Sequence, residues 1–331
     1  MSTVGKILIV VPCLNEEAHL PDLLDWLRSQ SEGAVVVVAD GGSTDASRAI
    51  VEARQSRWQS LHLLDNPERL QSAGVNKAVA AYGAGCQWLV RIDAHAAYPD
   101  NYVQTLLSSA ERQGAESVVV PMATVGASCF QRAVAAAQNS VLGTGGSAHR
   151  HIGAGKYVDH GHHALMRLDA FNAVGGYDRT FSHNEDAEID YRLTAAGYRI
   201  WLEPRASLTY FPRATLSGLW RQYRNFGKGR ARTIQKHRIK PRLRQMLPVG
   251  IAPIVVAAAL AAPLCLASLW ALILALPFLG WSTICLLAGV VLAVRSRSLC
   301  LAATGIALMT MHSAWSLGFW SQIATLRQAD G

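Results

Sequence analysis

The sequence predicts an α/β fold, with a mostly parallel sheet that carries helices on both faces, followed by a C-terminal transmembrane helical anchor. In the first two-thirds of the chain, short apolar runs alternate with amphipathic helical patterns, an order typical of doubly wound sheets. From Leu247 to Val294 the chain has no Asp, Glu, Lys or Arg. The composition, 50% hydrophobic and 16% charged over 331 residues, favours a packed core over disorder.

The strands and helices of the α/β part are expected in alternating order. Residues 6–11 and 34–39 are continuous apolar runs, which we interpret as buried parallel strands. Between them, residues 16–29 place four leucines on one helical face. Further strands are predicted at residues 88–92 and 117–121, and further helices at residues 43–53, 70–82 and 99–113. A sheet of this kind binds ligands at the carboxyl ends of its strands.

The loop after the first strand excludes two common phosphate-binding motifs. It has the sequence Pro12-Cys-Leu-Asn-Glu16, where a dinucleotide-binding domain would need G-x-G-x-x-G, and the chain has no P-loop. A dinucleotide-dependent oxidoreductase is therefore not expected. Any bound phosphate should be held by a metal ion or by side chains.

The N-terminus and the cysteines indicate a cytosolic soluble domain. The first apolar run is too short, and too quickly followed by Asn15 and Glu16, to be a signal peptide. The six cysteines are scattered without C-x-x-C spacing, so neither a disulfide framework nor a zinc site is indicated.

The uncharged C-terminal stretches predict about three membrane spans. At ~1.5 Å per residue, a helix over residues 247–294 would exceed twice the ~30 Å hydrocarbon core, so two spans, or one span and a re-entrant segment, fit best. Residues 299–326 are long enough for another span. The expected domains are an α/β domain at 1–213, a basic amphipathic juxtamembrane segment at 214–246 and the anchor at 247–327.

Positive charge is concentrated just before the anchor. Residues 228–244 contain eight Lys and Arg and no acid, which equals the formal net charge of +8. A polybasic segment beside a hydrophobic stretch marks the cytoplasmic side and attracts anionic lipid, so we favour a membrane over nucleic acid as its partner. Arg295 and Arg297 would return to the same side, which gives an in-out-in-out path with the C-terminus outside.

Two acidic clusters are candidates for chemistry. Asp93 and His95 directly follow the predicted strand at residues 88–92, where a carboxylate and an imidazole can bind Mn²⁺ or Mg²⁺ together with a diphosphate. The alternative is a capping Asp and a surface His. Glu185 and Asp186 begin a helix whose acidic first turn the macrodipole would favour without catalysis, although a carboxylate there could also act as a general base.

Three further features have alternative interpretations. The segment at residues 149–163 holds five of the eleven histidines, but its spacing fits no common zinc finger, so we interpret it as a mobile loop over the site that could lend a His to a metal. Trp220, Tyr223 and Phe226 could stack on a ligand, but we favour an amphipathic helix that packs on the domain or lies on the membrane. His312, inside the last apolar stretch, is interpreted as a helix contact.

Six motifs follow one another along residues 5–213. They are Pro12-Cys-Leu-Asn-Glu16, Ala39-Asp-Gly-Gly-Ser-Thr-Asp45, Ala73-Gly-Val-Asn76, Asp93-Ala-His95, Val174-Gly-Gly-Tyr-Asp178 and Asn184-Glu-Asp186. In order and spacing they resemble the family 2 inverting glycosyltransferases with the GT-A fold. The region from Tyr210 to Gly227 is similar to the bacterial succinoglycan-type branch, the ExoA-like glucosyltransferases.

The resemblance implies roles for individual residues. Asp186 matches the catalytic base, with Glu185 as its partner, and Asp93 and His95 match a D-x-H form of the motif that binds Mn²⁺ or Mg²⁺. Asn225 stands where the Q-x-x-R-W motif of processive synthases has Trp, so a single transfer is expected. The nucleotide-sugar, with uridine as the expected base, would be held by Pro12, Asn15, Glu16, Asp40, Gly42, Asn76, Asp93, Arg221 and Arg224.

The resemblance further implies a multi-pass protein of the bacterial inner membrane with a cytoplasmic catalytic domain. It would move a hexose, glucose from UDP-glucose, to a polyprenyl-diphosphate-linked saccharide in exopolysaccharide biosynthesis. The expected partners are the UDP-sugar donor, this acceptor, membrane lipid and other polysaccharide assembly proteins. Two alternatives remain: transfer directly to polyprenyl phosphate or another membrane lipid, and a non-catalytic sugar-nucleotide-binding scaffold.

Overall fold

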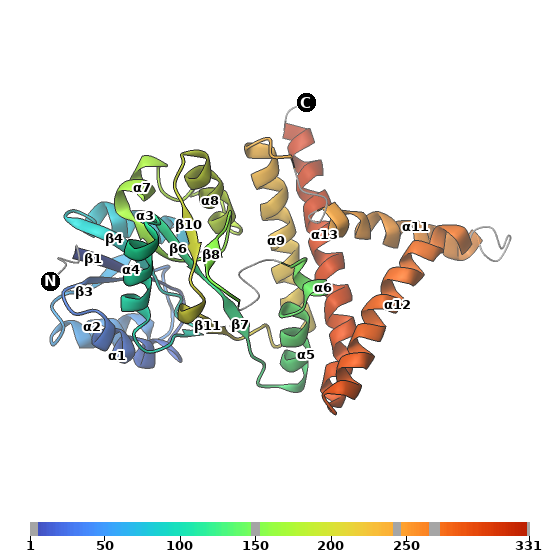
Figure 1. Cartoon of the computed structure of the whole chain (residues 1–331), viewed down its shortest axis with the longest axis horizontal. Helices are drawn as coiled ribbons and strands as arrows, with labels where there is room; N and C mark the ends of the chain where they lie inside the picture. The colour runs from blue at the N-terminus through green and yellow to red at the C-terminus, as the bar shows by residue number, and fades with distance from the viewer. Residues whose placement is uncertain (1–5, 147–152, 241–245, 265–271, 330–331) are drawn as a thin grey trace. The chain divides into compact units, whose positions relative to one another are not determined.

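The chain forms two compact units in the computed structural model, which describes residues 6–146, 153–240, 246–264 and 272–329 (Figure 1). The sheet unit contains the described residues up to Ala123 and those from residue 153 to Tyr210. The helical unit contains the described residues from Thr124 to residue 146 and from Phe211 onward. Each unit has its own apolar core.

The sheet unit is built on an eight-stranded mixed sheet with the strand order β3-β2-β1-β4-β9-β6-β10-β8. Strands β3, β2, β1 and β4 are parallel, whereas β9 runs antiparallel to both of its neighbours, β4 and β6. A smaller sheet has the order β5-β11-β7. The strands are β1 (Lys6–Cys13), β2 (Val35–Asp40), β3 (Leu61–Asp65), β4 (Cys86–Arg91), β5 (Ala96–Ala97), β6 (Ser117–Val120), β7 (Met122–Thr124), β8 (Lys156–Tyr157), β9 (His162–Arg167), β10 (Ile200–Leu202) and β11 (Leu208–Tyr210).

Helices cover both faces of this sheet, as the sequence predicts. Ile9 and Val11 of β1 join the core formed with α1, α2 and α4, while Leu8 and Val10 join the core formed with α3, α7 and α8. Because both faces are covered, the strands consist of continuous apolar residues. The helices of the unit are α1 (Leu20–Gln30), α2 (Ser47–Gln55), α3 (Gln71–Tyr82), α4 (Tyr102–Gln113), α7 (Leu168–Ala173), α8 (Glu185–Ala195) and η2 (Pro204–Ala206).

The predicted strands and helices of the first half are confirmed, but two helices begin later than expected. Helices α1 and α2 were expected from residues 16 and 43 and begin at Leu20 and Ser47. The residues before them donate their backbone N–H groups to side chains, as Thr44 N does to Asn15 Oδ1 at 2.8 Å and Glu16 N to Ser47 Oγ at 2.9 Å. Strand β3, at the edge of the sheet, was not predicted.

The helical unit consists mainly of long helices. Its elements are α5 (Cys129–Gln138), α6 (Val141–Thr144), α9 (Leu216–Lys236), η3 (Leu247–Gly250), α11 (Ile251–Leu264), α12 (Leu272–Arg295), η5 (Leu299–Ala303) and α13 (Thr304–Ala329). Three stretches are long and apolar enough to cross a membrane: Leu247–Leu264, Leu272–Arg295 and Leu299–Thr325. The predicted amphipathic helix with Trp220, Tyr223 and Phe226 is present as α9, in which Tyr223 is buried.

One segment of the predicted α/β domain belongs to the helical unit. The described residues from Thr124 to residue 146 group with it, and the second boundary falls after Tyr210, where the sequence predicts residue 213. Helix α5 explains this, because its Val134 shares a core with Leu308 of α13. The amphipathic sequence pattern of α5 predicts that the helix has an apolar face. It does not predict which distant element covers that face.

A disulfide joins Cys129 of α5 to Cys300 of η5, so the expectation that the cysteines indicate no disulfide is wrong. The two residues are separated by 171 positions and meet because α5 packs beside η5 and α13. Sequence spacing carries no information about such a pair.

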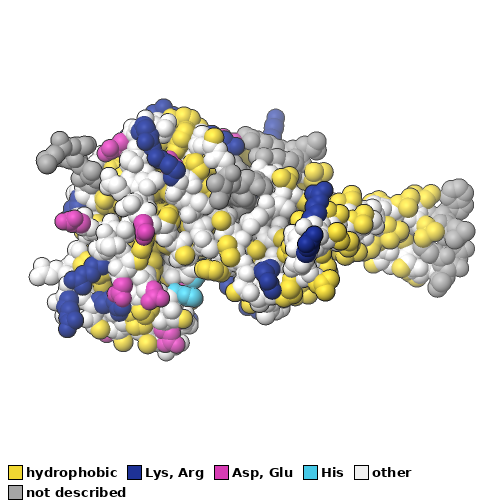
Figure 2. Space-filling view, turned by 60° about the horizontal axis from the view of Figure 1, so that its bottom comes forward, with side chains coloured by type: hydrophobic (Ala, Val, Ile, Leu, Met, Phe, Trp, Pro, Cys, Tyr) yellow, Lys and Arg dark blue, Asp and Glu magenta, His cyan; other side chains and the backbone are white. Residues whose placement is uncertain are grey.

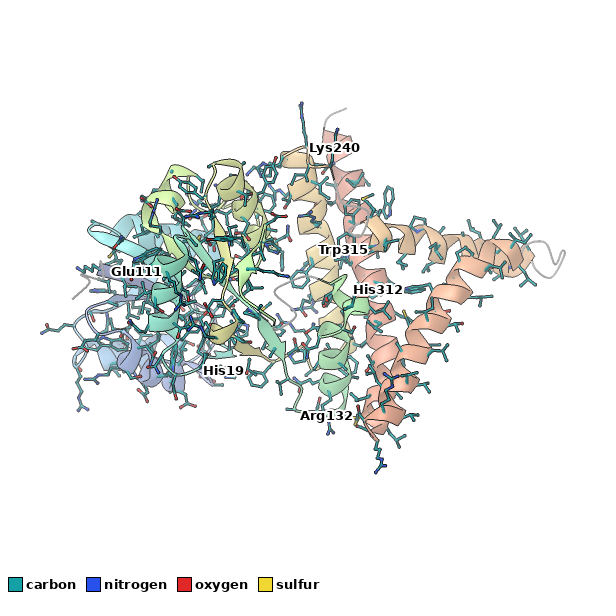
Figure 3. All side chains as sticks on the ribbon, viewed as in Figure 1. His19, Glu111, Arg132, Lys240, His312 and Trp315 are labelled. Carbon is teal, nitrogen blue, oxygen red and sulfur yellow. A yellow bond between two sulfur atoms is a disulfide. The ribbon has the colours of Figure 1, made fainter. Side chains whose placement is uncertain are left out.

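His312 of α13 makes the helix contacts that were expected (Figure 3). Its Nδ1 accepts a hydrogen bond from Trp281 Nε1 at 3.2 Å, and its Nε2 lies 3.0 Å from the Leu142 carbonyl oxygen. The ring therefore links α13 to α12 and to α6.

Candidate active site

Two interlocked loops shape the carboxyl ends of β1 and β2. Asn15, with a φ of 56°, accepts a hydrogen bond from Thr44 N at 2.8 Å. Its own backbone N–H donates to Ser43 Oγ at 2.9 Å. The neighbouring Glu16 is held through Ser47 in the same way. Asn15 and Glu16, two of the predicted nucleotide-binding residues, therefore lie on one surface whose shape is fixed by hydrogen bonds.

Asp40 completes this surface at the end of β2. Its side chain is buried, and Oδ2 accepts hydrogen bonds from Gly42 N at 3.1 Å and Arg48 Nη1 at 2.8 Å. Burial would raise the pKa of Asp40, but hydrogen bonds from Ser43 and Arg48 lower it. Gly42 has a φ of 82°, a conformation that favours glycine. Pro12, at the end of β1, pairs with Ala39, next to Asp40 in β2. Contact of Pro12, Asp40 and Gly42 with a nucleotide stays a prediction.

Asp93 and His95 lie at the same edge, just after β4. Asp93 Oδ1 accepts a hydrogen bond from Gln71 Nε2 at 2.9 Å, and its Oδ2 lies 3.3 Å from His162 Nε2. His95 Nδ1 lies 3.0 Å from Glu16 Oε1. The predicted metal residues and the predicted nucleotide residues are therefore neighbours, joined through Glu16.

A buried arginine joins the two acidic clusters. Arg91 of β4 donates from Nη1 and Nη2 to the two carboxylate oxygens of Asp186 at 2.5 and 3.0 Å, and its Nε lies 3.6 Å from Asp93 Oδ1. Burial would raise the pKa of Asp186, but Arg91 and His163 outweigh burial and hold it well below its ordinary value. Asp186 is therefore ionised and oriented toward the edge that carries Asp93.

Glu185, next to this pair, has the opposite electrostatic environment. Burial, together with the charge of Asp186, raises the pKa of Glu185 to about 7. A general base works best when its pKa lies near the working pH. The site thus offers two carboxylates for proton removal. The resemblance to family 2 implies that Asp186 is the base and Glu185 its partner.

The pH dependence of kcat/KM distinguishes these two carboxylates. A base must be deprotonated, so activity falls as the pH drops through its pKa. Because the pKa of Asp186 is lowered, we expect no acid limb near neutral pH. An acid limb at about pH 7 that disappears in Glu185→Gln would reassign the base to Glu185.

Behind the Arg91–Asp186 pair lies a buried network that the sequence analysis did not predict. His163 of β9 places Nε2 2.5 Å from Asp190 Oδ1 and Nδ1 2.7 Å from the Tyr177 hydroxyl. That hydroxyl lies 3.4 Å from Asp186 Oδ1. Burial would lower the pKa of His163, but Asp190 and Asp186 raise it. A protonated His163 can donate to Asp190 and Tyr177 at once, which fixes the support of Asp186.

The histidine-rich segment at residues 149–163, predicted to be a mobile loop, ends in a strand of the sheet. His162 and His163 belong to β9 and lie inside the sheet, so the interpretation of this part as a mobile loop is wrong. Because β9 is antiparallel to β4, it begins at the edge where β4 ends, and this brings His162 beside Asp93. His149 and His151 lie outside the described residues.

Asn76 of α3 positions the loop that leads to α8. Its Nδ2 donates to the Tyr177 carbonyl oxygen at 2.7 Å, and its Oδ1 accepts from Tyr177 N at 2.9 Å. A Cβ atom at Gly176 would lie 2.8 Å from the same Oδ1, which is why this position needs glycine. Both ends of the amide are engaged, and direct nucleotide binding by Asn76 stays a prediction.

Arg221 and Arg224, predicted to assist with the donor diphosphate, belong to the other unit. Both are exposed on α9 of the helical unit. Their role in donor binding stays a prediction.

The donor atoms of Asp93 and His95 fit a divalent ion such as Mn²⁺ or Mg²⁺, since both bind carboxylate oxygen and Mn²⁺ also accepts imidazole nitrogen. Within the described ranges, no group of three or more His, Cys, Asp or Glu side chains could hold a metal ion. Two protein ligands plus a diphosphate is a usual arrangement for ions that bridge nucleotide phosphates. His162, 3.3 Å from Asp93, is a third nearby nitrogen.

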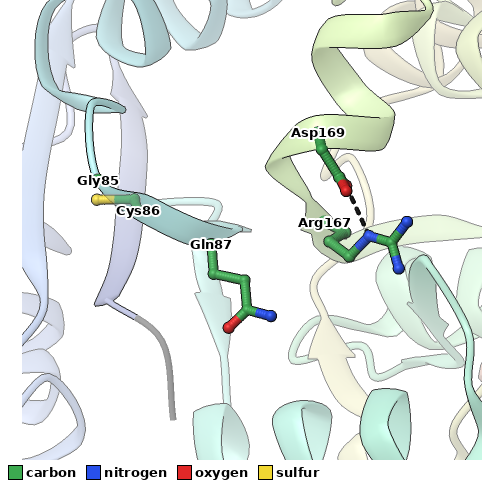
Figure 4. Close-up of a pocket in the computed structure, with 5 residues that line it drawn as sticks. All are labelled: Gly85, Cys86, Gln87, Arg167 and Asp169. Atoms are coloured by element: carbon green, nitrogen blue, oxygen red, sulfur yellow. Dashed lines mark hydrogen bonds and ion pairs between the residues drawn. The ribbon is translucent and has the colours of Figure 1, made fainter. Parts of the chain in front are cut away.

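An open pocket of the sheet unit lies away from these residues (Figure 4). It occupies the opposite edge of the sheet, where β4 begins and β9 ends. Its lining residues are Gly85, Cys86, Gln87, Arg167 and Asp169. The described pocket contains none of the predicted site residues, and ligands of α/β sheets bind at the carboxyl ends of the strands. We therefore place the candidate site at the edge with Asp93 and Asp186.

Comparison with known sequences gives two findings. The family model described as glycosyl transferase family 2 matches residues 8–175. The succinoglycan biosynthesis protein ExoA of Rhizobium meliloti (strain 1021) is 50% identical over 323 residues, which cover 97% of this chain and 96% of that protein.

Two solved structures have a similar fold. The mannosyltransferase PcManGT from Pyrobaculum calidifontis, in complex with GDP-Man and Mn²⁺, aligns with a TM-score of 0.58 at 18% identity, over 97% of this chain and 88% of that one. GalNAc-T7 with UDP, GalNAc and Mn²⁺ aligns with a TM-score of 0.51 at 13% identity, over 72% of this chain and 55% of that one. At these identities the likeness concerns the fold, which is GT-A.

Proposed function

Because the chain belongs to glycosyltransferase family 2, we propose that it transfers a hexose from UDP-glucose, with inversion, to a polyprenyl-diphosphate-linked saccharide. The reaction would take place at the edge of the sheet that carries Asp93 and Asp186. The observation that carries the proposal is the buried Arg91, which pairs with Asp186 and lies beside Asp93. The Arg91 guanidinium thereby sets the distance between Asp93, which is proposed to bind the donor, and Asp186, which is proposed to accept the proton. The 50% identity to a succinoglycan biosynthesis protein supports a membrane-associated enzyme of exopolysaccharide synthesis.

The interlocked loops would bind the donor nucleotide. Asn15, Glu16 and Asp40 lie on a surface that is already shaped by hydrogen bonds, so binding costs little ordering of these loops. Asp93 and His95 would hold a divalent ion on the diphosphate. When bound, that ion neutralises the negative charge that develops on the departing nucleoside diphosphate.

Asp186 would act on the acceptor. The acceptor hydroxyl oxygen forms a bond to the anomeric carbon while the bond from that carbon to the diphosphate oxygen breaks, and its electron pair leaves with the nucleoside diphosphate. The hydroxyl proton passes to Asp186. Arg91 keeps Asp186 ionised before the transfer and oriented during it. Attack from the face opposite the leaving group inverts the anomeric centre.

The apolar helices and the basic segment support a membrane-bound acceptor. The three apolar stretches suggest a multi-pass protein of the inner membrane, and the cations at residues 228–244 favour a cytoplasmic position for the catalytic domain. A lipid-linked saccharide diphosphate is anionic and lies at that surface. Other polysaccharide assembly proteins are further proposed partners.

A donor panel with membranes that contain the full-length chain tests the proposal. Extracted lipid acceptor is supplied with UDP-sugars or GDP-sugars, and release of the nucleoside diphosphate is scored. We expect UDP-glucose to be consumed and a labelled lipid-linked saccharide to appear on thin-layer analysis. A labelled product on polyprenyl phosphate alone would favour direct transfer to a lipid. No consumption of any donor with any lipid fraction would favour the non-catalytic scaffold.

Metal dependence gives a further prediction. Chelation by EDTA should abolish transfer and added Mn²⁺ should restore it, because the donor diphosphate needs the ion that Asp93 and His95 hold. His95→Ala should lower activity at least about tenfold and raise the Mn²⁺ concentration needed, whereas His95→Asp should retain metal-dependent transfer. The control is His19→Ala, an exposed histidine before α1 (Figure 3). Full activity after chelation would contradict the metal assignment.

A further inference from the structure

The last apolar helix, α13, is covered by protein far more than the two before it. In its apolar window 44% of the residues are buried, against 17% for the stretch with α11 and 11% for α12. Among its described side chains, the exposed large apolar ones are Ile306, Leu317 and Trp320. Helices α11 and α12, in contrast, expose large apolar side chains along most of their length, and Figure 2 shows them over the visible face.

Helix α9 runs beside α13 in the same direction. Near the start of the pair, Leu219 of α9 shares a core with Leu308 of α13. Three turns further on, Ala231 of α9 shares a core with Phe319 of α13. The two helices are therefore neighbours over several turns rather than at a single crossing point.

Glycines bring the backbones of these two helices into contact. A side chain at Gly227 of α9 would clash with the carbonyl oxygen of Trp315, and one at Gly318 of α13 would clash with that of Arg224. Trp315 lies near the middle of α13 in Figure 3. The depth of α13 in a membrane is thus tied to the depth of α9.

The charge of α9 excludes it from the hydrocarbon. It carries six Lys and Arg and no Asp or Glu, and Arg221 and Arg224 are exposed. A charged side chain is strongly unfavourable at the bilayer centre, whereas a basic amphipathic helix is stable in the headgroup layer. Because α13 follows α9 in backbone contact, α13 belongs in the same layer.

The middle of α13 also contacts a polar segment. His312 Nε2 lies 3.0 Å from the carbonyl oxygen of Leu142 in α6. Just before α6, Asn139 exchanges hydrogen bonds with the backbone of Thr124 at 3.1 and 2.9 Å. If α13 crossed the membrane, this contact would lie near the bilayer centre, about 15 Å from either headgroup layer. Polar backbone and amide groups of that kind are expected at the interface instead.

Helices α11 and α12 leave α13 and return to it. Where η3 leads into α11, Trp320 Nε1 donates to the Val249 carbonyl oxygen at 2.9 Å and Ala252 N donates to Ser316 Oγ at 2.9 Å. Helix α12 comes back to the start of α13, where Gly305 touches the Cys285 backbone.

We infer that the membrane is entered by a hairpin of α11 and α12 alone, and that α13 lies in the interface beside α9. The apolar surface of this hairpin would contact lipid acyl chains. The exposed apolar side chains of α13, which are Ile306, Leu317 and Trp320, would contact the headgroup boundary. The C-terminus then lies on the same side of the membrane as α9. An in-out-in-out path with three crossings would put the C-terminus on the opposite side.

Reporter fusions to the C-terminus of the full-length chain decide between the two paths. We expect a green fluorescent protein fused after Gly331 to fluoresce and an alkaline phosphatase at the same position to be inactive, because the basic α9 marks the cytoplasmic side. Fusions after Arg295, where both paths predict a cytoplasmic position, serve as the control. An active phosphatase with a dark fluorescent protein at the C-terminus would overturn the hairpin.

A matched pair of charge substitutions gives a second measurement that does not depend on a fusion. Ile284 and Leu317 lie near the middle of α12 and α13, and their side chains are 58% and 43% exposed. We expect Ile284→Lys to remove most of the protein from the membrane fraction and Leu317→Lys to leave it bound, since a lysine is tolerated in the headgroup layer. Equal loss for both variants would show that α13 crosses the hydrocarbon.

Discussion

Asp186→Asn is expected to lower kcat/KM on the order of 1,000-fold, the middle of the range for a positioned general base. The amide keeps the shape of the carboxylate but cannot accept the acceptor proton. Donor binding should persist, because the surface proposed to bind the nucleotide is formed by the loops after β1 and β2. The measurement is transfer to extracted lipid acceptor beside donor binding by the same membranes.

Two comparison variants make this result specific. Glu185→Gln should lose much less activity, since Glu185 is proposed only to support Asp186. Asp169→Asn replaces an exposed acid at the start of α7 that is not among the predicted site residues. This variant should be as active as the parent protein. If Asp186→Asn stayed active while Glu185→Gln did not, the two roles would be exchanged. If both stayed active, the scaffold alternative would stand.

Arg91→Met should destabilise the protein by about 3–5 kcal/mol, because it leaves the Asp186 carboxylate inside the protein without its partner. Arg91→Lys should recover only part of this loss, since an ammonium cannot form the two parallel hydrogen bonds of the guanidinium. Because Arg91 lowers the pKa of Asp186, the stabilisation is present above the ordinary aspartate pKa and is lost as the pH falls through the lowered value. Denaturant unfolding of the detergent-solubilised chain measures the difference.

The controls for Arg91 use a double variant and an exposed pair. Arg91→Met combined with Asp186→Asn should be more stable than Arg91→Met alone, since no unpaired charge remains, yet it should stay inactive. Arg54→Met breaks a pair with Asp25, whose side chain is 71% exposed, and should cost no more than about 1 kcal/mol. Equal costs for Arg91→Met and Arg54→Met would contradict the structural role of Arg91.

The sequence predicts the first half of the sheet well because the relevant information is local. Continuous apolar runs mark β1, β2 and β4. The acid that ends β2 and the acid that follows β4 lie at the site edge because parallel strands end together. Asp40 and Asp93 could therefore be selected from their positions alone. Glu185 and Asp186 could be selected because they open a helix, and their motif carried the resemblance.

The support of Asp186 could not be predicted in the same way. His163 and Tyr177 reach it only because β9 enters the sheet in the antiparallel direction between β4 and β6. In the sequence, Arg91 is one charged residue inside an apolar run, and nothing near it indicates that it pairs with Asp186. Their partners are set by strand order, which spacing along the chain does not encode. Only the richness of residues 149–163 in histidine pointed to this part of the site.

The packing of α5 against α13 has a consequence for the order in which the chain is made. Cys129 at the start of α5 precedes Cys300, just before α13, by 171 residues. At a synthesis rate of about 5–20 residues per second, the ribosome needs on the order of ten to thirty seconds to cover that distance. During this time the strands of the sheet unit are all completed, while the apolar face of α5 still lacks the helix that covers it. The sheet unit can thus fold first, and the apolar face of α5 is covered only once α13 has been synthesised.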